Sequence, residues 1–320
     1  MIKRYYVYQD NKLKIILKIE GEKMKKSIKS IISLSLILSL NIAFPLKKPN
    51  AISNNDETAS ECFQEDGVLG DILDIDNIRD IFSALSNGDE LNWYYVGKGK
   101  DQIAESPRES SDFLKENDAC YLGDTSKKVL YLTFDEGYEN GHTGKILDIL
   151  KQNQVPAAFF VVKPYITTQP ELIKRMVAEG HIVGNHTVHH PSMAQIHDTE
   201  KFKAELKGVE DAYKEIIGQD LPKFFRPPMG KYSKQSLQMT KDLGYKTIFW
   251  SFAYKDWLVN NQPAENYAIQ KINKGAHPGS IMLLHAVSET NTKVLETVIK
   301  TLKEEGYEFK SLNDLPSWIE

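Results

Sequence analysis

The sequence has little cysteine, and it lacks two motifs that would indicate other classes of enzyme. Cys62 and Cys120 are the only cysteines among 320 residues, and neither has the close spacing of a metal-binding pair. An exported chain could join them in a disulfide, and the sequence leaves that pairing open. No His-Glu-x-x-His occurs, which argues against a metalloprotease. No phosphate-binding glycine fingerprint follows the first predicted strand of the repeating part, residues 128–134, which argues against a nucleotide-binding fold.

Positive charge is also scarce once the first 51 residues are set aside. These residues hold 11 of the 40 Lys and Arg but 3 of the 44 Asp and Glu, so residues 52–320 keep 29 basic and 41 acidic side chains. Their formal charge of −12 repels the phosphates of nucleic acids. The charge therefore disfavours a nucleic-acid partner.

The most apolar stretch of the chain predicts a secretory signal. Residues 24–29 are basic, and residues 31–44 consist mostly of Ile, Leu and Ser. This stretch is short and serine-rich for a membrane span, so we expect export, with membrane contact only through an uncleaved signal. Cleavage is expected after Ala43 or Ala51. Residues 1–23 fit no part of a signal, so we expect Met24 to be the start of the protein, the alternative being a longer basic leader.

From residue 126 to residue 312 the sequence alternates between predicted strands and predicted helices. About seven such units with short connections predict an α/β fold, a distorted β/α barrel, with an open doubly wound sheet as the alternative. We expect a signal region at 1–51, a polar spacer with a small pre-domain at 52–125, including a helix at 68–87, and a tail at 313–320. The predicted strands are 128–134, 157–162, 181–184, 223–226, 246–250, 280–284 and 307–310, and the predicted helices are 143–153, 169–179, 199–217, 233–243, 263–274 and 292–305.

Polar side chains follow the C-terminal ends of five predicted strands, and these ends share one rim in a parallel barrel. Two imidazoles four residues apart can reach one ion from a helical or tight turn, and a carboxylate from a neighbouring strand end completes a site for Zn, Mn, Co or Fe. His189, which lies between the two, is expected to be a bystander. The five groups are Asp135 with Glu136, His186 with His190, Arg226, Asp256 with Trp257, and His285.

Taken in order, these motifs resemble the polysaccharide deacetylase family with a NodB homology domain, carbohydrate esterase family four. The resemblance covers about residues 126–312, and the five motifs are specific together although each alone is weak. Residues 133–137 resemble T-F-D-D-G, 186–190 resemble H-[ST]-x-x-H, 226–230 resemble R-x-P-[YF]-G, 250–257 resemble the segment that ends in Asp-Trp, and 283–285 resemble L-x-L-H. Residues 137–141, 225–228, 250–253 and 276–279 are similar to one subgroup, the δ-lactam-forming de-N-acetylases of spore peptidoglycan.

The resemblance implies a role for each catalytic candidate. Asp135 is expected to be the general base that activates the attacking water, oriented by a charge-assisted pair with Arg226. His285 is expected to be the general acid for the leaving amine, oriented by Asp256.

The resemblance also implies a divalent metal ion of the Zn, Mn or Co class, held by Glu136, His186 and His190. Glu136 stands where the family has an aspartate. Its longer side chain displaces the carboxylate, so we expect weak or water-mediated binding of the ion.

The walls of the site are implied as well. Trp257 and Leu283 would enclose the acetyl methyl group, and Pro228 and Met229 would contact the substrate. A main-chain N–H near Met229 would stabilise the oxyanion. Met229 replaces an aromatic residue of the family, and Ala253 replaces a frequent aspartate, as in the subgroup.

The implied function is an exported enzyme that removes acetyl groups from N-acetylmuramic acid in peptidoglycan glycan strands. It would act as a monomer in the cell wall or the spore cortex, during δ-lactam formation. The alternatives are a deacetylase of N-acetylglucosamine polymers or of acetylated xylan, and a carbohydrate-binding module that has lost catalysis. The presence of Asp135, Arg226, Asp256 and His285 argues against the last of these.

Overall fold

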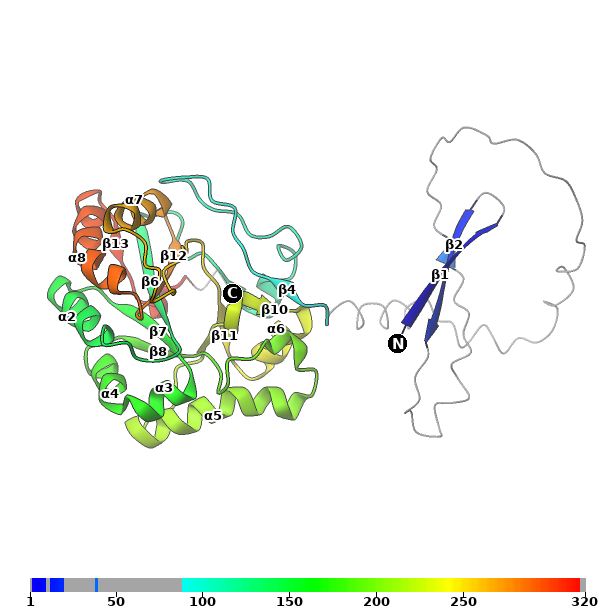
Figure 1. Cartoon of the computed structure of the whole chain (residues 1–320), viewed down its shortest axis with the longest axis horizontal. Coiled ribbons are helices and arrows are strands. Elements are labelled where there is room, and N and C mark those ends of the chain that lie inside the picture. The colour runs from blue at the N-terminus through cyan, green and yellow to red at the C-terminus, as the bar shows by residue number, and fades with distance from the viewer. Residues whose placement is uncertain (1, 10–11, 20–37, 40–87, 317–320) are drawn as a thin grey trace, which may run out of the picture. The chain divides into compact units, whose positions relative to one another are not determined.

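The computed structural model describes residues 2–9, 12–19, 38–39 and 88–316, and the chain divides into two units, Met1–Asp66 and Gly67–Glu320 (Figure 1). In the first unit, β1 (Ile2–Gln9) and β2 (Lys12–Ile19) form an antiparallel hairpin, and β3 (Leu38–Ser39) pairs with β2. Apart from β3, the predicted signal and its cleavage sites lie outside the described residues, as do the predicted spacer and helix at 52–87 and Cys62. Within the described ranges, no helix is long and apolar enough to cross a membrane.

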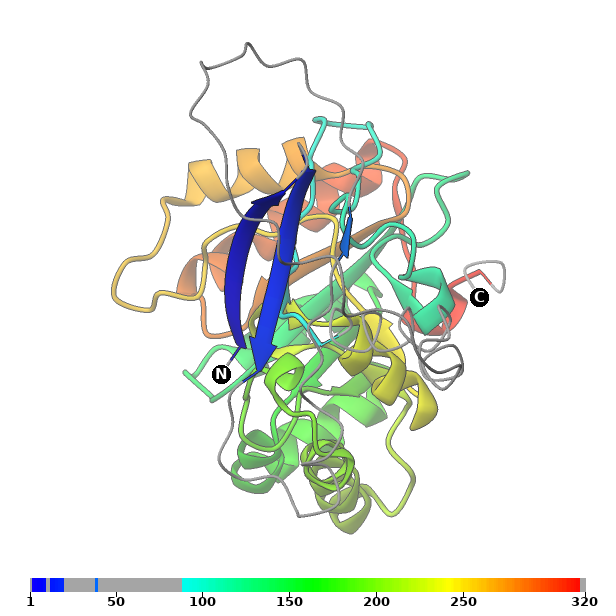
Figure 2. The same cartoon turned by 90° about the vertical axis from the view of Figure 1, so that its right-hand side faces the viewer.

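The second unit is built around a parallel sheet that curls toward a barrel (Figures 1 and 2). The strands follow the order β12-β6-β7-β8-β9-β11-β5, and β13 also pairs with β6. Isolated bridges from Leu122 to Ser280 and from Phe252 to Met282 link the two ends of this order. The predicted distorted barrel is therefore confirmed. Its strands are β5 (Ala119–Cys120), β6 (Val129–Glu136), β7 (Ala157–Val161), β8 (Ile182–Asn185), β9 (Phe224–Phe225), β11 (Lys246–Ile248), β12 (Ser280–His285) and β13 (Glu308–Phe309).

Helices cover the outside of the curled sheet, and they begin and end where the sequence provides caps (Figure 1). The side chain of Asp198 accepts hydrogen bonds from two N–H groups in the first turn of α5, and Gly218, with a φ of +76°, ends that helix. Each of the six helices predicted between residues 143 and 305 is present within three residues of its predicted ends, whereas the helix predicted at 68–87 lies outside the described residues. The helices are α2 (Thr143–Asn153), α3 (Lys163–Thr168), α4 (Pro170–Ala178), α5 (Thr199–Ile217), α6 (Lys234–Asp242), α7 (Glu265–Gly275) and α8 (Glu289–Glu304).

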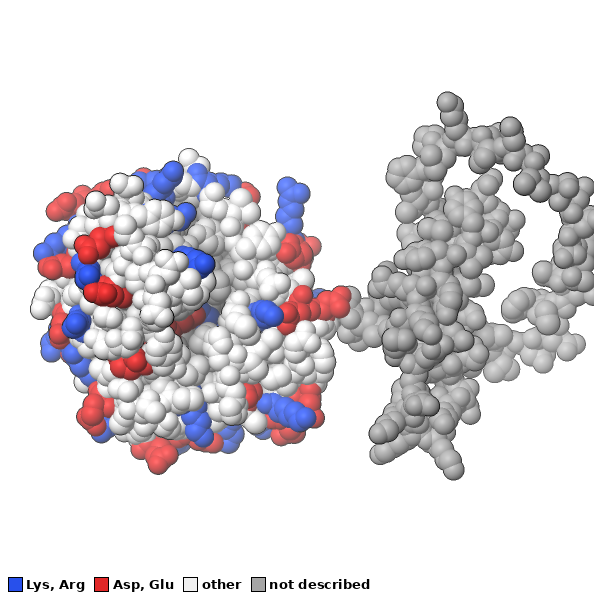
Figure 3. Space-filling view, viewed as in Figure 1, with Lys and Arg blue, Asp and Glu red and all other residues white. Residues whose placement is uncertain are grey.

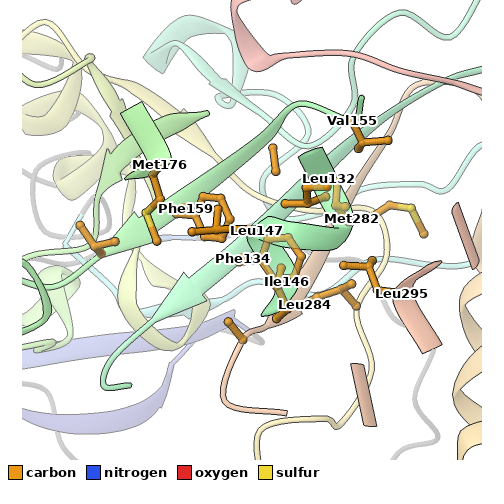
Figure 4. Close-up of a cluster of buried hydrophobic side chains, with 14 of the residues drawn as sticks. Leu132, Phe134, Ile146, Leu147, Val155, Phe159, Met176, Met282, Leu284 and Leu295 are labelled. Atoms are coloured by element: carbon orange, nitrogen blue, oxygen red, sulfur yellow. The ribbon is translucent and has the colours of Figure 1, made fainter. Parts of the chain in front are cut away.

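The main core lies between the sheet and these helices, and it fixes which way each side chain of β6 points. Leu132 and Phe134 pack with Ile146 and Leu147 of α2 in this layer (Figure 4). Successive side chains of a strand point to opposite faces, so Thr133 and Asp135 point to the inside of the curled sheet. One face of β6 therefore serves the core, and the other delivers polar groups to the interior.

Residues 88–125 pack on the barrel rather than apart from it. The pair of strands β4 (Leu91–Asn92) and β10 (Lys231–Tyr232) joins this segment to the loop after β9. Trp93 stacks on Phe249 with ring centroids 4.2 Å apart, and its Nε1 donates to the carbonyl of Trp250 at 2.9 Å. Short 3-10 turns complete the unit: η1 (Lys115–Asn117), η2 (Met193–Gln195), η3 (Pro228–Gly230) and η4 (Leu312–Asp314).

Cys120 is buried in β5 and forms no disulfide with any other described residue. Burial raises the pKa of this thiol to about 12, so the thiolate is scarce at neutral pH. Cys62 is not among the described residues, so the pairing that the sequence leaves open stays untested.

Acidic and basic side chains are interspersed over the face of the second unit shown in Figure 3. Neither sign dominates that face.

Candidate active site

The C-terminal ends of β6 and β12 bring two of the predicted residues side by side. Asp135 and His285 are register partners in this parallel pair, so their side chains leave the same face of the sheet. Both line a cleft of about 480 Å³. The other residues that line it are Gly137, Tyr138, His186, His190, Met229, Gly230, Trp250, Trp257, Leu283 and Val287.

Arg226 does not line the cleft but holds Asp135 through an ion pair. Its Nη1 donates to Oδ1 of Asp135 at 2.8 Å and also to Oγ1 of Thr133 at 2.8 Å. Its remaining donors reach the carbonyls of Ile248 at 3.0 Å and Phe249 at 3.4 Å. The guanidinium is fully buried, so these contacts with the protein replace its hydration.

Asp135 stays ionised because its neighbours outweigh the cost of burial. Burial alone would raise the pKa of this carboxyl, but the charge of Arg226, together with His186 and His285, lowers the pKa below its usual value. An ionised carboxylate that faces a cleft has the properties of a general base.

His186 and His190 lie on a loop rather than a helix, and two unusual backbone conformations bring their rings together. Thr187 and His190 have φ values of +73° and +57°, which cost on the order of 1–3 kcal/mol each for non-glycine residues. Hydrogen bonds hold this conformation, from the N–H of Thr187 to Oδ1 of Asn185 and from the N–H of His190 to Oγ1 of Thr187, each at 2.9 Å. The two imidazole centroids are 4.9 Å apart.

The tautomer of His186 follows from its contacts. Its Nδ1 donates to the carbonyl of Arg226 at 2.8 Å, which leaves the lone pair on Nε2, 3.7 Å from Oδ2 of Asp135. Burial lowers the pKa of His186 to about 4 and also lowers that of His190. Both rings are therefore neutral at neutral pH, as metal ligands must be.

Glu136, the third expected ligand, does not join these imidazoles. It follows Asp135 on β6, so its side chain points to the opposite face of the sheet, and it is absent from the cleft lining. Both of its carboxylate oxygens are buried without a hydrogen-bond partner. Burial, with the charges of Glu139 and Asp135, raises the pKa of Glu136 well above its usual value. Among the described residues, no group of three or more His, Cys, Asp or Glu is arranged to hold a metal ion.

His285 and Asp256 form a closely hydrogen-bonded dyad beside Asp135. Nδ1 of His285 lies 2.7 Å from Oδ1 of Asp256, and the backbone N–H of His285 donates to Oδ2 at 2.9 Å. Because fully buried Asp256 accepts a hydrogen bond from the Nδ1–H of His285, Nε2 is the free nitrogen of the ring that lines the cleft. Burial lowers the pKa of His285, but the hydrogen bond and charge of Asp256, with the charge of Asp135, raise it overall.

Apolar side chains form the walls of the cleft. Trp257 is 47% exposed with its ring 5.4 Å from that of His285, and Leu283 is buried but lines the cleft. Met229 is 53% exposed on the rim, where its φ of +59° turns the backbone. Pro228, also predicted to contact substrate, is buried in η3 and does not line the cleft.

Sequence reasoning assigned no role to Tyr138 or to the loop that carries it. Tyr138 is 54% exposed on the rim of the cleft. The loop is fixed on both sides, because Asn140 donates to the carbonyl of Val287 at 3.0 Å and Glu139 accepts from the hydroxyl of Tyr165 at 2.9 Å. The similarity of residues 137–141 to the subgroup is the signal in the sequence that points to this loop.

Comparisons with known proteins fit this geometry. The family model described as polysaccharide deacetylase matches residues 122–248. The peptidoglycan-N-acetylmuramic acid deacetylase PdaA of Bacillus subtilis (strain 168) is 44% identical over 225 residues, which cover 70% of this chain and 85% of that protein. An uncharacterized 30.6 kDa protein of Geobacillus stearothermophilus is 48% identical over 233 residues, which cover 73% of this chain and 88% of that protein.

Two solved structures are similar in both fold and sequence. The structure of Bacillus subtilis PdaA, a family 4 carbohydrate esterase, matches with a TM-score of 0.69 and 43% identity, over 71% of this chain and 97% of that chain. A family 4 carbohydrate esterase from Bacillus anthracis matches with a TM-score of 0.59 and 45% identity, over 71% of this chain and 96% of that chain.

Proposed function

The chain belongs to the polysaccharide deacetylase family of hydrolases, and from this premise we propose that it removes the acetyl group from N-acetylmuramic acid in peptidoglycan. The observation that carries the proposal is the cleft in which Asp135 and His285 face the same space from neighbouring strands. A base and an acid on the two sides of one amide are what its hydrolysis requires. The similarity to PdaA, which spans most of the barrel, is the reason for proposing N-acetylmuramic acid as the sugar.

Asp135 is the proposed general base. Its Oδ1 is engaged by Arg226, so Oδ2 is the oxygen that takes a proton from water in the cleft. The lowered pKa keeps this carboxylate ionised well into the acid range. Arg226 also fixes the orientation of the carboxylate before substrate binds.

His186 and His190 are the proposed protein ligands of a divalent ion. Their donor set fits, because both rings are neutral and Nε2 of His186 carries its lone pair toward Asp135. Such an ion would lower the pKa of the attacking water and polarise the acetamide carbonyl. Glu136 does not face this position, so the proposed ligands from the chain are the two imidazoles.

His285 is the proposed general acid. Its Nδ1–H donates a hydrogen bond to Asp256, so the protonated ring offers the Nε2 proton to the leaving amine. Trp257 and Leu283 would enclose the acetyl methyl group, and the main chain near Met229 would donate to the oxyanion. Export, action in the spore cortex and a monomeric state remain proposals that accompany this function.

A panel of substrates tests the proposal. The purified protein should release acetate from peptidoglycan glycan strands that lack stem peptides. The assay is run both with and without added Zn²⁺, Mn²⁺ or Co²⁺. Mass spectrometry of the products should place the lost acetyl on N-acetylmuramic acid. Release only from N-acetylglucosamine polymers or from acetylated xylan would replace the proposed substrate. No release under any condition would favour a binding module.

Replacing His285 by alanine is expected to lower kcat by roughly 100- to 10,000-fold while binding of the glycan changes little. In the wild type, kcat/KM should fall as the pH rises through the raised pKa of His285, because only the protonated ring is an acid. Steady-state kinetics across pH would measure both effects. A change confined to KM in His285→Ala would contradict the acid role.

Ion binding should depend on His190 and not on Glu136. His190→Ala is expected to weaken Zn²⁺ binding by roughly 10- to 100-fold, while Glu136→Gln leaves it near the wild-type value. His189→Ala is the matched control, because the side chain of His189 is 76% exposed and hydrogen-bonded to Glu205. Calorimetric titration of metal-stripped protein gives the affinities without any activity assay. An equal loss in Glu136→Gln and His190→Ala would restore Glu136 as a ligand.

A further inference from the structure

A buried polar network lies behind His285, and the proposed mechanism does not yet use it. Asp256 is fully buried, Asn291 is 1% exposed and Tyr254 is 7% exposed. Nδ2 of Asn291 donates to Oδ2 of Asp256 at 2.6 Å and to the carbonyl of His285 at 3.1 Å. The hydroxyl of Tyr254 donates to Oδ1 of Asn291. One asparagine thus contacts both members of the dyad.

Asp256 depends on these contacts because a buried carboxylate has no water to solvate it. It accepts three hydrogen bonds, from Nδ1 of His285, from the backbone N–H of His285 and from Asn291. Without Asn291, Oδ2 would keep a single donor, the backbone N–H of His285, and the carboxylate would be held less firmly against rotation about its Cβ–Cγ bond. That rotation would displace Oδ1 from the imidazole.

The orientation of the Asn291 amide is fixed from two directions. A tyrosine hydroxyl donates to its oxygen, so its nitrogen must face Asp256. Its backbone N–H donates at 3.1 Å to the hydroxyl of Ser288, the residue that caps α8. Ser288 in turn donates at 2.6 Å to Gln262, and the side-chain amide of Gln262 donates to the carbonyl of Asp256 at 2.9 Å. These hydrogen bonds therefore connect the start of α8 to the loop that carries Asp256.

We propose that Asn291 is a positioning residue for deacetylation. By holding Asp256, it keeps the Nδ1–H of His285 hydrogen-bonded and Nε2 directed into the cleft. Asn291 does not line the cleft, so it contacts no substrate. This inference rests on the proposed function only for the consequence on turnover. The hydrogen-bond arrangement that it describes exists in the protein without substrate.

The electrostatic setting of His285 makes the arrangement measurable. The charged groups that face its ring are Asp256, Asp135 and Arg226, and His190 shares the cleft. An Nδ1 proton held 2.7 Å from a buried carboxylate oxygen exchanges slowly and resonates at low field, so it serves as a direct reporter.

The experiment compares Asn291→Leu, which removes the donor at similar volume, with Thr290→Val on the same turn of α8. Thr290 is 5% exposed and donates to the carbonyl of Pro263 at 2.8 Å, so its variant loses a buried hydrogen bond without touching the dyad. We expect Asn291→Leu to lower kcat by roughly 10- to 100-fold with little change in KM, and Thr290→Val to leave both near the wild-type values.

Proton NMR on the same proteins reads the positioning directly. The low-field Nδ1–H signal, assigned by its loss in His285→Gln, should move upfield and broaden in Asn291→Leu but persist in Thr290→Val. Tyr254→Phe, which keeps the ring and removes the hydroxyl, should weaken the signal and lower kcat by a smaller factor. This milder variant decides the matter if Asn291→Leu fails to fold.

An unchanged His285 signal and an unchanged kcat in Asn291→Leu, or in Tyr254→Phe if that variant must decide, would overturn the inference. If the wild type released no acetate from any glycan but Asn291→Leu still lost the Nδ1–H signal of His285, the positioning role would be supported and the proposed function refuted. The two failures are therefore distinguishable.

Discussion

Replacing Asp135 by asparagine is expected to lower kcat by roughly 1,000-fold or more while the protein stays folded. Asparagine has nearly the same shape but cannot take a proton from water, so the variant removes the base and little else. Its side-chain oxygen can still accept from Arg226, and the guanidinium keeps its bonds to Thr133 and to the carbonyls of Ile248 and Phe249. Acetate release and a thermal melt of the same preparation measure the two effects.

The matched control for this variant is Asp148→Asn. Asp148 is also paired with an arginine, Arg175, but its side chain is 58% exposed on α2 and does not line the cleft. We expect turnover of Asp148→Asn to equal that of the wild type. Turnover by Asp135→Asn close to that of the wild type would remove Asp135 from the base role.

The sequence predicts the second unit well because its elements are long, periodic and clearly capped. The 19 residues of α5 have an aspartate cap, an apolar face and a terminal glycine, and the predicted and observed ends coincide. By contrast, β5 is two residues long, Ala119–Cys120, too short to give a period. It is recognisable as a barrel strand only from its pairing with β11. The hairpin of β1 and β2 was not predicted, because residues 1–23 were expected to precede the start of the protein at Met24.

The candidate site was predicted in composition more successfully than in orientation. The rim argument brings Asp135, His186, Arg226 and His285 together because parallel strands end on one side. The same reasoning grouped Glu136 with them, although the period of two in a strand sends adjacent side chains to opposite faces. That alternation was already visible in the sequence, in the apolar Leu132 and Phe134 that share the parity of Glu136.

Asn291 was beyond prediction for a different reason. A polar residue in the first turn of a helix is ordinary, since caps and first turns favour such side chains. Its contact with Asp256, 35 residues away, depends on how α8 packs against the segment between β11 and α7. Contacts between a catalytic group and the residues behind it come from tertiary packing, which a local sequence pattern does not encode.

Replacing Arg226 by methionine is expected to lower the free energy of unfolding by about 3–5 kcal/mol. The side chain is fully buried, and its loss would leave Asp135 as an unpaired buried charge, with Thr133 and two carbonyls short of a donor. The pKa of Asp135 is lowered in the wild type, so the pair stabilises the fold above the unfolded-state pKa and loses this effect as pH falls through the folded-state pKa. In the variant the pKa should rise, so the difference from the wild type should shrink in acid.

Urea unfolding of Arg226→Met at several pH values measures this effect, with Arg175→Met as the matched control. Arg175 also pairs with carboxylates, Glu179 and Asp148, but on the surface of α4, where such pairs contribute roughly 0–1 kcal/mol. Adding Asp135→Asn to Arg226→Met should recover part of the lost stability, because the unpaired charge is then gone. Either of two results would contradict a stabilising role for the ion pair between Arg226 and Asp135. One is a loss of unfolding free energy in Arg226→Met no larger than in Arg175→Met, and the other is no recovery of unfolding free energy on adding Asp135→Asn.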